Sequence, residues 1–475
     1  MRSVLAATLL TMGVIAILLA GLPAGNAGVP GLVPEPARAQ TAPVQPQISF
    51  SIRGFNLPSW QSNQYASPAA AGALGDVAAT GANWVAIDPT QYVSNVHSVT
   101  IGPDPGGRTA TDAAVAAAID QAHALGLKVM LKPHVDVEDG SCRCDIAPTD
   151  PAAWFASYNA MIDDYARLAQ AHHVELLAVG TELTDISGAG YYQLWQQVVA
   201  GVRSIYSGPL TYASGQDEYQ SLSFWGLLDY MGVDVYLPLS DAAQPTSSQL
   251  ISGWTAYSGR YGSYNWLDQL TRWQAQWHKP VIFTELGYRS VRYAASSPWD
   301  YSFAGTYDGE LQARAADAAL RVFNNQPWLA GIFWWDWMVG SDTGGQGNTD
   351  YTVQGKPAQA TLTAWYSSAA PQLGVTAASI SWGSLDNYQQ GRLNVAFNVV
   401  NNGNGTAYRA RVVSIDASGG STAAGFVPVT LGDLPSGSSA SLTVVYHVPA
   451  GTLAFKTLVT ITCVDASGQL LGFSR

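Results

Sequence analysis

From residue 48 onward, short runs of apolar and β-branched residues alternate with segments whose apolar positions recur every three or four residues. The first pattern predicts buried strands and the second predicts amphipathic helices. Eight strands are predicted, at residues 48–56, 83–88, 128–136, 174–182, 209–214, 231–239, 279–286 and 329–337. Because this alternation is typical of a closed parallel barrel, residues 48–370 are predicted to form a (β/α)8 TIM barrel of the α/β class. A doubly wound open sheet is the main alternative, but no glycine-rich dinucleotide turn follows the first strand.

The pattern changes after residue 370. Residues 371–475 contain short alternating strands separated by turns rich in Gly, Asn and Ser, which predicts a small Ig-like all-β sandwich. This accessory domain could be a stabilising spacer or a carbohydrate-binding module. Its one tryptophan, Trp382, offers no obvious aromatic platform, and this favours the spacer.

The N-terminal segment has the features of an export signal. Arg2 supplies a positive start, residues 4–20 are apolar, and Ala37-Arg38-Ala39 resembles a signal cleavage site. We therefore expect a signal peptide at residues 1–39, a linker rich in Pro and Gln at 40–47, and an extracytoplasmic protein, either secreted or at the cell surface. Another cleavage point and an uncleaved membrane anchor are the alternatives.

Charged residues are scarce along the whole chain. They make up 12% of the residues, against roughly 25% in an average soluble domain, and the formal net charge is -12. This negative charge disfavours a nucleic-acid partner, because its phosphates would be repelled. The 16 Trp and 23 Tyr residues suit a protein that stacks on uncharged rings such as sugars, although aromatic residues also fill ordinary cores. We expect a monomer.

The three cysteines are too few to build a disulfide framework. Cys142 and Cys144 flank Arg143, so a bridge between them would close a very small ring, and the sequence leaves their redox state open. No second ligand pair with a suitable spacing is visible, so no metal site is predicted. Cys463 lies in an alternating strand and is predicted to be a buried core thiol.

Two glutamates end predicted barrel strands. Glu182 closes the fourth strand, and Glu285 lies near the end of the seventh. An unpartnered carboxylate is costly in apolar surroundings, so a strand that ends in Glu usually presents it to a site. Either residue alone could be a structural Glu in a cap or a salt bridge. Two carboxyl groups at the C-terminal mouth of one barrel are what glycoside hydrolysis needs, so both are predicted to be catalytic.

The third predicted strand separates polar from apolar positions. Lys132, His134 and Asp136 share one parity, and the apolar residues between them share the other. Because alternate residues of a barrel strand point into the lumen, these three polar side chains are predicted to face the mouth and to bind substrate. A structural role is the alternative for a single histidine.

Aromatic residues mark the sixth and eighth predicted strands. Tyr236 could hydrogen-bond a carboxylate nucleophile or simply pack. In the eighth strand, Trp335 and Trp337 share one parity and Trp334 has the other. A flat indole at the mouth would stack on a sugar ring, so Trp335 and Trp337 are predicted to bind substrate, although at least one of the three should be buried.

Seven segments in consistent order resemble glycoside hydrolase family 113, a family of retaining β-mannanases with barrel folds. The segments lie within residues 50–365 and are HALGLKVMLKPHVDVEDG, DPAAWF, VGTELT, LTYASGQDE, GVDVYLPL, KPVIFTELGYRS and GIFWWDW. The resemblance implies that Glu182 is the general acid/base and Glu285 the nucleophile. It also implies β-1,4-mannan or manno-oligosaccharides as the substrate, and no cofactor.

Two positions differ from the pattern of related retaining enzymes. Thr181 precedes the acid/base where many relatives have Asn, a difference that family 113 itself shares. Cysteines flank Arg143 where a Trp-Arg-Gly type of sequence is expected. The predicted substrate contact near Arg143 is therefore expected to be altered, which affects chain-length preference more than chemistry.

The predicted function is an exported, endo-acting hydrolase that cleaves β-1,4-mannosidic bonds by double displacement. The same residues could act on another β-linked glycan, such as glucan, galactan or xylan, because a fold does not fix its substrate. A non-catalytic surface protein that only binds polysaccharide is a second alternative, which the retained glutamate pair disfavours.

Overall fold

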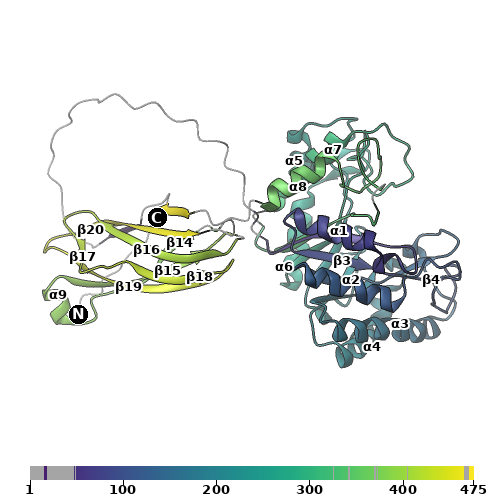
Figure 1. Cartoon of the computed structure of the whole chain (residues 1–475), viewed down its shortest axis with the longest axis horizontal. Coiled ribbons are helices and arrows are strands. Elements are labelled where there is room, and N and C mark those ends of the chain that lie inside the picture. Colours follow the sequence, from purple (N-terminus) through teal and green to yellow (C-terminus); the bar gives the residue numbers. More distant parts are fainter. Residues whose placement is uncertain are drawn as a thin grey trace. The chain divides into compact units, whose positions relative to one another are not determined.

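The computed structural model of this 475-residue chain forms two compact units, Phe50–Ser367 and Ser368–Arg475 together with Met1–Ser49 (Figure 1). The first unit corresponds to the predicted barrel. The predicted linker, and all of the predicted signal peptide except Ile15–Leu18, lie outside the described residues. The structure describes residues 15–18, 48, 50–324, 326–340, 343–367, 371, 373–403, 405–464 and 470–474.

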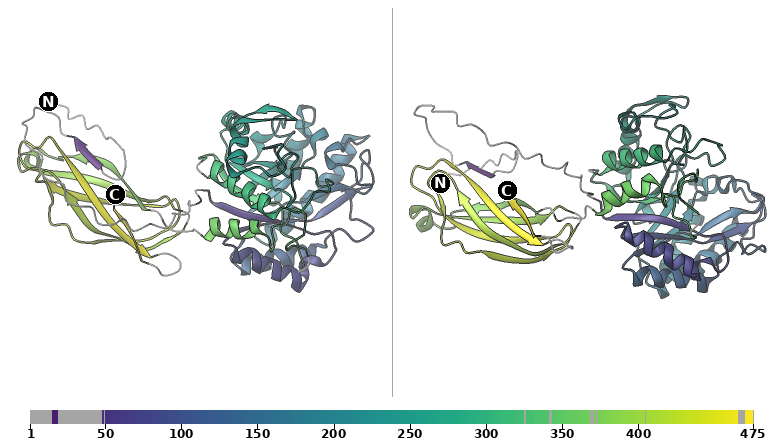
Figure 2. Two further views of the ribbon diagram at one scale, coloured as in Figure 1. Left: turned by 90° about the horizontal axis from the view of Figure 1, so that it is seen from above. Right: turned by 45° about the horizontal axis from the view of Figure 1, so that its top comes forward.

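The first unit is a closed barrel of parallel strands, and the helices lie around its outside (Figure 1, Figure 2). All eight predicted strands are present, and the predicted fold class is confirmed. Every neighbouring pair in the barrel is parallel. The strands, in order around the barrel, are β2 (Ile52–Pro58), β3 (Trp84–Asp88), β5 (Lys128–Leu131), β7 (Leu176–Thr181), β8 (Leu210–Ser214), β9 (Met231–Val235), β12 (Val281–Leu286) and β13 (Leu329–Trp334), which pairs with β2.

The helices begin where the sequence supplies capping residues. The Asp150 side chain accepts a hydrogen bond from the backbone N–H of Ala153, and Thr111 does the same for Ala114. The described residues between β8 and β9 contain a short 3₁₀ helix but no α-helix. The α-helices of the barrel are α1 (Pro68–Ala79), α2 (Asp112–Ala124), α3 (Pro151–Ala171), α4 (Tyr192–Ile205), α5 (Ser247–Ala256), α6 (Trp266–Trp277), α7 (Gly309–Phe323) and α8 (Pro357–Ser367).

The third predicted strand is interrupted. The barrel strand β5 ends at Leu131, and after Pro133 a separate short strand, β6 (His134–Val137), pairs with β4 (Thr90–Val93). A proline has no N–H for the ladder, which accounts for the break. The remaining short elements are the hairpin strands β10 (Tyr257–Gly259) and β11 (Gly262–Tyr264) and the 3₁₀ helices η1 (Gln64–Ala66), η2 (Arg143–Asp145), η3 (Thr184–Ile186), η4 (Ala189–Tyr191) and η5 (Trp225–Leu227).

An apolar cluster fills part of the barrel lumen. Met130 on β5 and Ile282 on β12 belong to one buried cluster, although their strands lie on opposite sides of the barrel. Such residues meet only inside the barrel. Phe333 packs closely against β2, because a Cβ atom at Gly54 would lie 2.4 Å from its ring. The cluster consists of Ile52, Trp84, Ala86, Met130, Leu176, Ile282 and Phe333.

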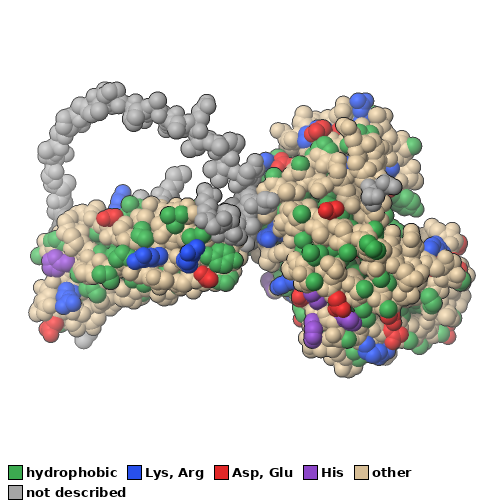
Figure 3. Space-filling model, viewed as in Figure 1, with side chains coloured by type: hydrophobic (Ala, Val, Ile, Leu, Met, Phe, Trp, Pro, Cys, Tyr) green, Lys and Arg blue, Asp and Glu red, His purple; other side chains and the backbone are tan. Residues whose placement is uncertain are grey.

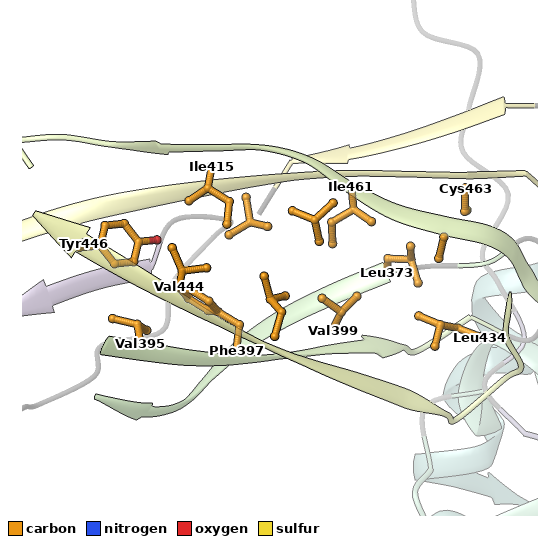
Figure 4. Packing of buried hydrophobic residues seen from close by; sticks show 14 of the residues in the cluster. Leu373, Val395, Phe397, Val399, Ile415, Leu434, Val444, Tyr446, Ile461 and Cys463 are labelled. Atoms are coloured by element: carbon orange, nitrogen blue, oxygen red, sulfur yellow. The ribbon is translucent and has the colours of Figure 1, made fainter. Parts of the chain in front are cut away.

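The C-terminal strands form two antiparallel sheets that enclose their own apolar core (Figure 4). The first sheet has the order β14-β15-β19-β17; in the second, β1-β20-β16-β18, β21 also pairs with β20. Cys463 is buried in this core, as predicted. The elements are β1 (Ile15–Leu18), β14 (Leu373–Ser381), α9 (Leu385–Gln389), β15 (Arg392–Asn401), β16 (Ala407–Ala417), β17 (Thr422–Ala423), β18 (Val429–Leu434), β19 (Ser439–His447), β20 (Ala454–Val464) and β21 (Leu470–Ser474).

Charged side chains are sparse on the molecular surface. On the face shown in Figure 3, Lys, Arg, Asp and Glu are scattered among uncharged side chains. Such a surface suits a neutral partner better than a polyanion. Among the described residues, no helix combines the length and the apolar character that crossing a membrane requires.

Candidate active site

Glu182 follows the last residue of β7 in an unusual backbone conformation. Its φ angle is 52°, in the left-handed region that residues other than glycine rarely adopt. The surrounding structure holds this turn in place. The Glu182 N–H donates to the Ala213 carbonyl at 2.8 Å, and the Leu183 N–H donates to the Tyr212 hydroxyl at 2.8 Å. Tyr212 in turn donates to buried Glu218 at 2.7 Å. Local strain of this kind is typical of functional sites.

Glu285 lies near the end of β12, and both of its carboxylate oxygens accept hydrogen bonds. Lys132 Nζ donates to Oε1 at 2.5 Å, and the Tyr236 hydroxyl donates to Oε2 at 2.6 Å. Burial and the charge of Glu285 raise the pKa of Tyr236 well above its usual value, so its hydroxyl keeps its proton. Glu285 is therefore held by two donors in an orientation suited to an ionised carboxylate.

Lys132 lies behind Glu285 and is fully buried. It is 3.7 Å from Asp88 and 2.5 Å from Glu285. Burial lowers the pKa of Lys132. The negative charges of Glu285, Asp88 and Asp234 raise it by a larger amount, so the pKa of Lys132 lies above its ordinary value. The prediction that Lys132 binds substrate needs correction. With no exposed surface, its contacts are with the carboxylates and not with the cleft.

His134 also reaches the site without lining it. The side chain is buried, and its ring stacks on Trp335 with a centroid distance of 6.3 Å. Burial, then the positive charges of Arg143 and Lys132, lower the pKa of His134 well below its usual value, so the ring is neutral. His134 does not line the cleft, so the structure gives no support to its predicted substrate contact, which stays a prediction. Its ring packs against the indole of Trp335.

Asp136 and Arg143 form an ion pair beside Glu182. Arg143 Nε and one terminal nitrogen (Nη2) lie 2.8 Å and 2.6 Å from the same oxygen of Asp136, and its other terminal nitrogen (Nη1) lies 3.5 Å from Glu182 Oε2. Both members of the pair line a cavity, as the prediction of substrate-binding residues requires.

Glu182 is poised to hold a proton near neutral pH. Burial is the main cause, followed by the charge of Glu285, and together they raise the pKa of Glu182 to about 7, although Arg143 and Lys132 lower it. Its side chain keeps 29% exposure, so solvent and ligands can reach it. A carboxyl group with a raised pKa next to a fixed carboxylate is the arrangement that acid/base catalysis requires.

Two adjoining cavities meet at the carboxyl pair. One has a volume of about 860 Å³ and is lined by Glu182. The other, of about 800 Å³, is lined by both Glu182 and Glu285. Glu182, Tyr236, Cys142 and Trp299 line both cavities, so we treat them as two parts of one cleft. Further aromatic residues line the cleft, namely Trp60, Tyr92, Tyr219, Tyr261, Tyr264, Trp266, Tyr301, Trp335 and Tyr351.

The three tryptophans predicted around the eighth strand have different environments. Trp335 lines the second cavity, a position that suits its predicted contact with substrate. Trp334 is buried and donates to the Tyr366 hydroxyl at 2.8 Å. Trp337 is 1% exposed and packs edge-on against Phe55 with a centroid distance of 5.2 Å, so its predicted substrate contact is wrong. The physical reason is that β13 ends at Trp334, and strand alternation cannot be extrapolated beyond that residue.

Several acidic residues of the site were missed from the sequence. Asp88 ends β3 at the same edge of the barrel, so the signal that identified Glu182 could have found it. Burial, partly offset by Lys132, raises the pKa of Asp88 to about 7. Asp234 pairs in register with Glu285. It lies two residues before Tyr236, on the same side of the strand pattern, so strand alternation could have identified it as a site residue. Asp336 lines the cleft, and burial raises its pKa to about 8.

Metal-binding groups are not evident in the described part of the chain. Among those residues, no set of three or more His, Cys, Asp or Glu side chains is arranged to hold a metal ion. Lys132 pairs with Glu285 and Arg143 lies near Glu182, and carboxyl groups placed in this way can transfer protons and attack as nucleophiles.

Comparisons with known proteins identify relatives of the barrel. The sequence profile of Glycoside Hydrolase Family 113 matches residues 55–356, well over half of the chain. A solved structure described as a complex structure of GH113 β-1,4-mannanase has a TM-score of 0.59 and 25% identity, over 68% of this chain and 100% of that one. The GH113 β-mannanase AaManA from Alicyclobacillus acidocaldarius, in complex with ManMIm, has a TM-score of 0.59 and 26% identity, over 67% and 98%. The comparison with curated proteins found no match.

Proposed function

The chain belongs to glycoside hydrolase family 113 and is a glycoside hydrolase, and we propose that it cleaves β-1,4-mannosidic bonds in mannan or manno-oligosaccharides with retention of configuration. One observation carries the mechanism. Both oxygens of Glu285 accept hydrogen bonds, one from Lys132 and one from Tyr236. Glu182 lines the same cavity, and the pKa of Glu182 is raised. Glu285 is thus oriented as a nucleophile by two hydrogen-bond donors, and Glu182 is able to carry a proton.

In the first step, a carboxylate oxygen of Glu285 attacks the anomeric carbon. The bond from that carbon to the glycosidic oxygen breaks, and Glu182 gives its proton to the departing oxygen. The product is a sugar esterified to Glu285 and a shortened glycan with a new hydroxyl group. Tyr236 and Lys132 act as positioning residues, because they fix the carboxylate in the cleft and stabilise its negative charge before attack.

In the second step, Glu182 is ionised and acts as a base. It removes a proton from a water molecule, whose oxygen attacks the anomeric carbon and displaces Glu285. Two inversions at the same carbon give net retention. Both carboxyl groups then regain their starting states, so no external acid, base or redox partner is consumed.

The lining of the cleft supports an uncharged polysaccharide as the substrate. Trp335 and Trp299 border the second cavity together with Trp60 and several tyrosines, and flat aromatic rings suit the apolar faces of sugar rings. The two solved relatives are described as a β-1,4-mannanase and a β-mannanase, which favours mannan within this class.

Release of reducing sugar from mannan, glucan and xylan tests the substrate. We expect the fastest release from mannan, and faster release from glucan or xylan would contradict the mannan assignment. Proton NMR of the first product tests the mechanism separately. Retention predicts that the β-anomer forms first and then mutarotates, whereas initial α-anomer would rule out double displacement.

We also propose that the protein is exported. The support is the positive residue Arg2, the apolar residues 4–20 and the small-residue site at Ala37-Arg38-Ala39. Mass determination of the N-terminus of protein recovered outside the cytoplasm tests this proposal. A mature N-terminus close to residue 40 is expected, and an intact protein retained in the cytoplasm would contradict it.

A further inference from the structure

A disulfide ring borders the cleft next to Glu182. Cys142 and Cys144 are joined, with their Cα atoms 5.1 Å apart, which resolves the redox state that the sequence left open. Arg143 is the one residue between them. Cys142 lines both cavities and Cys144 lines the larger one. The ring is therefore part of the cleft wall.

The side chain held between the two cysteines connects the wall to Glu182. The Arg143 guanidinium is bound to Asp136 at 2.6 Å, and its other terminal nitrogen lies 3.5 Å from Glu182. Asp136 belongs to β6, whose pairing with β4 fixes its backbone. The Cys144 N–H donates to Cys142 Sγ at 3.2 Å, a further contact within the ring.

We propose that the Cys142–Cys144 disulfide is a positioning device, which fixes the backbone of Arg143 so that its guanidinium stays between Asp136 and Glu182 during catalysis. This inference rests on the proposed function, because it assigns Arg143 as a positioning residue for the acid/base of that reaction. It concerns a residue pair that differs from the sequence expected at this place in the family.

The physical basis is the flexibility of arginine. A long side chain on a loop has many rotamers, and holding it in one geometry is costly in conformational entropy. A covalent ring around Arg143 restricts the backbone at the base of the side chain, and the contacts of two guanidinium nitrogens with one oxygen of Asp136 restrict its tip. With both ends held, the cation is already in place when the substrate enters.

Reduction would remove the restraint at the base. Cys142 is exposed, so a small dithiol can reach the bond. The dithiol gives two electrons and two protons, the S–S bond breaks, and both cysteines become thiols while the dithiol is oxidised to its own disulfide. Arg143 then keeps its contact with Asp136 but sits on a looser loop.

The effect on Glu182 has a definite sign. Arg143 lowers the pKa of Glu182 against the opposing influences of burial and Glu285. A less well placed Arg143 lets this pKa rise, so the protonated acid persists to higher pH. Charged groups face Glu182 or line its two cavities from several elements. They are Arg143 on η2, Asp136 on β6, Lys132 after β5, Glu218 after β8, Asp234 on β9, Glu285 on β12, Asp145, Asp185 and Asp217 in the larger cavity, and Arg108, Asp336 and Asp350 in the other.

The pH profile of kcat/KM on mannan tests the proposal with the full chain. In the dithiol-treated wild type, we expect the basic limb of the profile to shift to higher pH by roughly 0.5 unit. The shift is small because the Arg143–Glu182 ion pair is partly exposed to solvent. We expect kcat to fall roughly threefold through the lost placement. The Cys142→Ser/Cys144→Ser double variant should show the same profile without treatment, and dithiol should not change it further. Alkylation and mass spectrometry verify that the thiols have formed.

The Arg143→Gln variant shows whether the ring acts through arginine. Its basic limb should already be shifted, and reduction should add nothing. An unshifted profile in wild type with both thiols alkylated would overturn the proposal. So would a shift on reduction that is as large in Arg143→Gln as in wild type. Failure of the proposed function is distinct, because untreated wild type would then release no sugar from mannan or any other β-glycan, which ends both proposals.

Discussion

The two sides of the cleft hold their carboxyl groups in different ways. Glu285 is 5% exposed, and its two oxygens accept hydrogen bonds from the buried Lys132 and the half-buried Tyr236. The Glu182 side chain is 29% exposed, and its nearest cation lies 3.5 Å away on a disulfide loop. A nucleophile needs a permanent charge, whereas an acid/base must gain and lose a proton in each cycle. The surroundings of each carboxyl group match one of these needs.

The largest effect is expected from Glu285→Gln. The amide cannot attack the anomeric carbon, so kcat should fall by about 10⁴-fold or more. The fold should persist, because the amide oxygen can still accept one hydrogen bond, and circular dichroism should be unchanged. Sugar release from mannan measures the loss, and near-normal turnover would exclude Glu285 as the nucleophile.

Glu182→Gln should slow hydrolysis by about 10² to 10⁴-fold, because the variant cannot protonate the leaving oxygen. Hydrolysis of an aryl glycoside with an acidic phenol should slow less in this variant, since its leaving group needs no proton.

In the wild type, activity should decline as pH rises through about 7, where Glu182 loses its proton. Glu175→Gln, on the residue before β7 at the other end of the barrel, is the control and should remain active. Equal losses on both substrates would contradict the assignment.

Lys132→Met would leave Asp88, Asp234 and Glu285 without their buried cation. Because an unpaired buried charge is costly, the free energy of unfolding should fall by about 3 kcal/mol or more at neutral pH. Lys128→Met, on the exposed first residue of β5, should change it by less than about 0.5 kcal/mol. Urea titration measures both variants. Similar stability of the two would show that Lys132 is not needed to compensate the carboxylates.

Tyr236→Phe keeps the ring but removes the donor to Glu285. We expect kcat to fall by about 10 to 100-fold, with little change in KM, because one of two hydrogen bonds that hold the nucleophile is lost. Tyr192→Phe, at an exposed position of α4, controls for the loss of a hydroxyl group elsewhere. A change in KM alone would instead indicate that Tyr236 binds substrate.

The smallest effects should separate Trp335 from Trp337. Trp335→Phe should raise KM for mannan severalfold, because Trp335 lines the cleft. Trp337→Phe should leave KM unchanged and lower thermal stability, because its indole is buried against Phe55. Steady-state kinetics and thermal unfolding of the two variants decide the matter, and the opposite pattern would reverse the correction made from the structure.

Much of the fold could be predicted because each element carries its own pattern. Each of the eight strands is a short apolar run, and capping residues such as Asp150 and Thr111 mark helix starts directly. The same local logic found Glu182 and Glu285. It failed at Trp337 and across residues 132–134, where strand alternation was extended past the end of a strand or across a proline. Parity is a property of the ladder and holds only where the ladder continues.

The sequence alone determined the parallel barrel, its family and the identity of the two strand-end glutamates, because periodicity and short motifs are local. The tertiary structure decided which partners each glutamate has. Lys132 and Glu285 are 153 positions apart and meet at 2.5 Å only because the barrel closes with both in its lumen. The link from the Cys142–Cys144 ring through Arg143 to Glu182 is likewise a product of three-dimensional packing. Contacts across a closed sheet depend on register and burial, which no local pattern specifies.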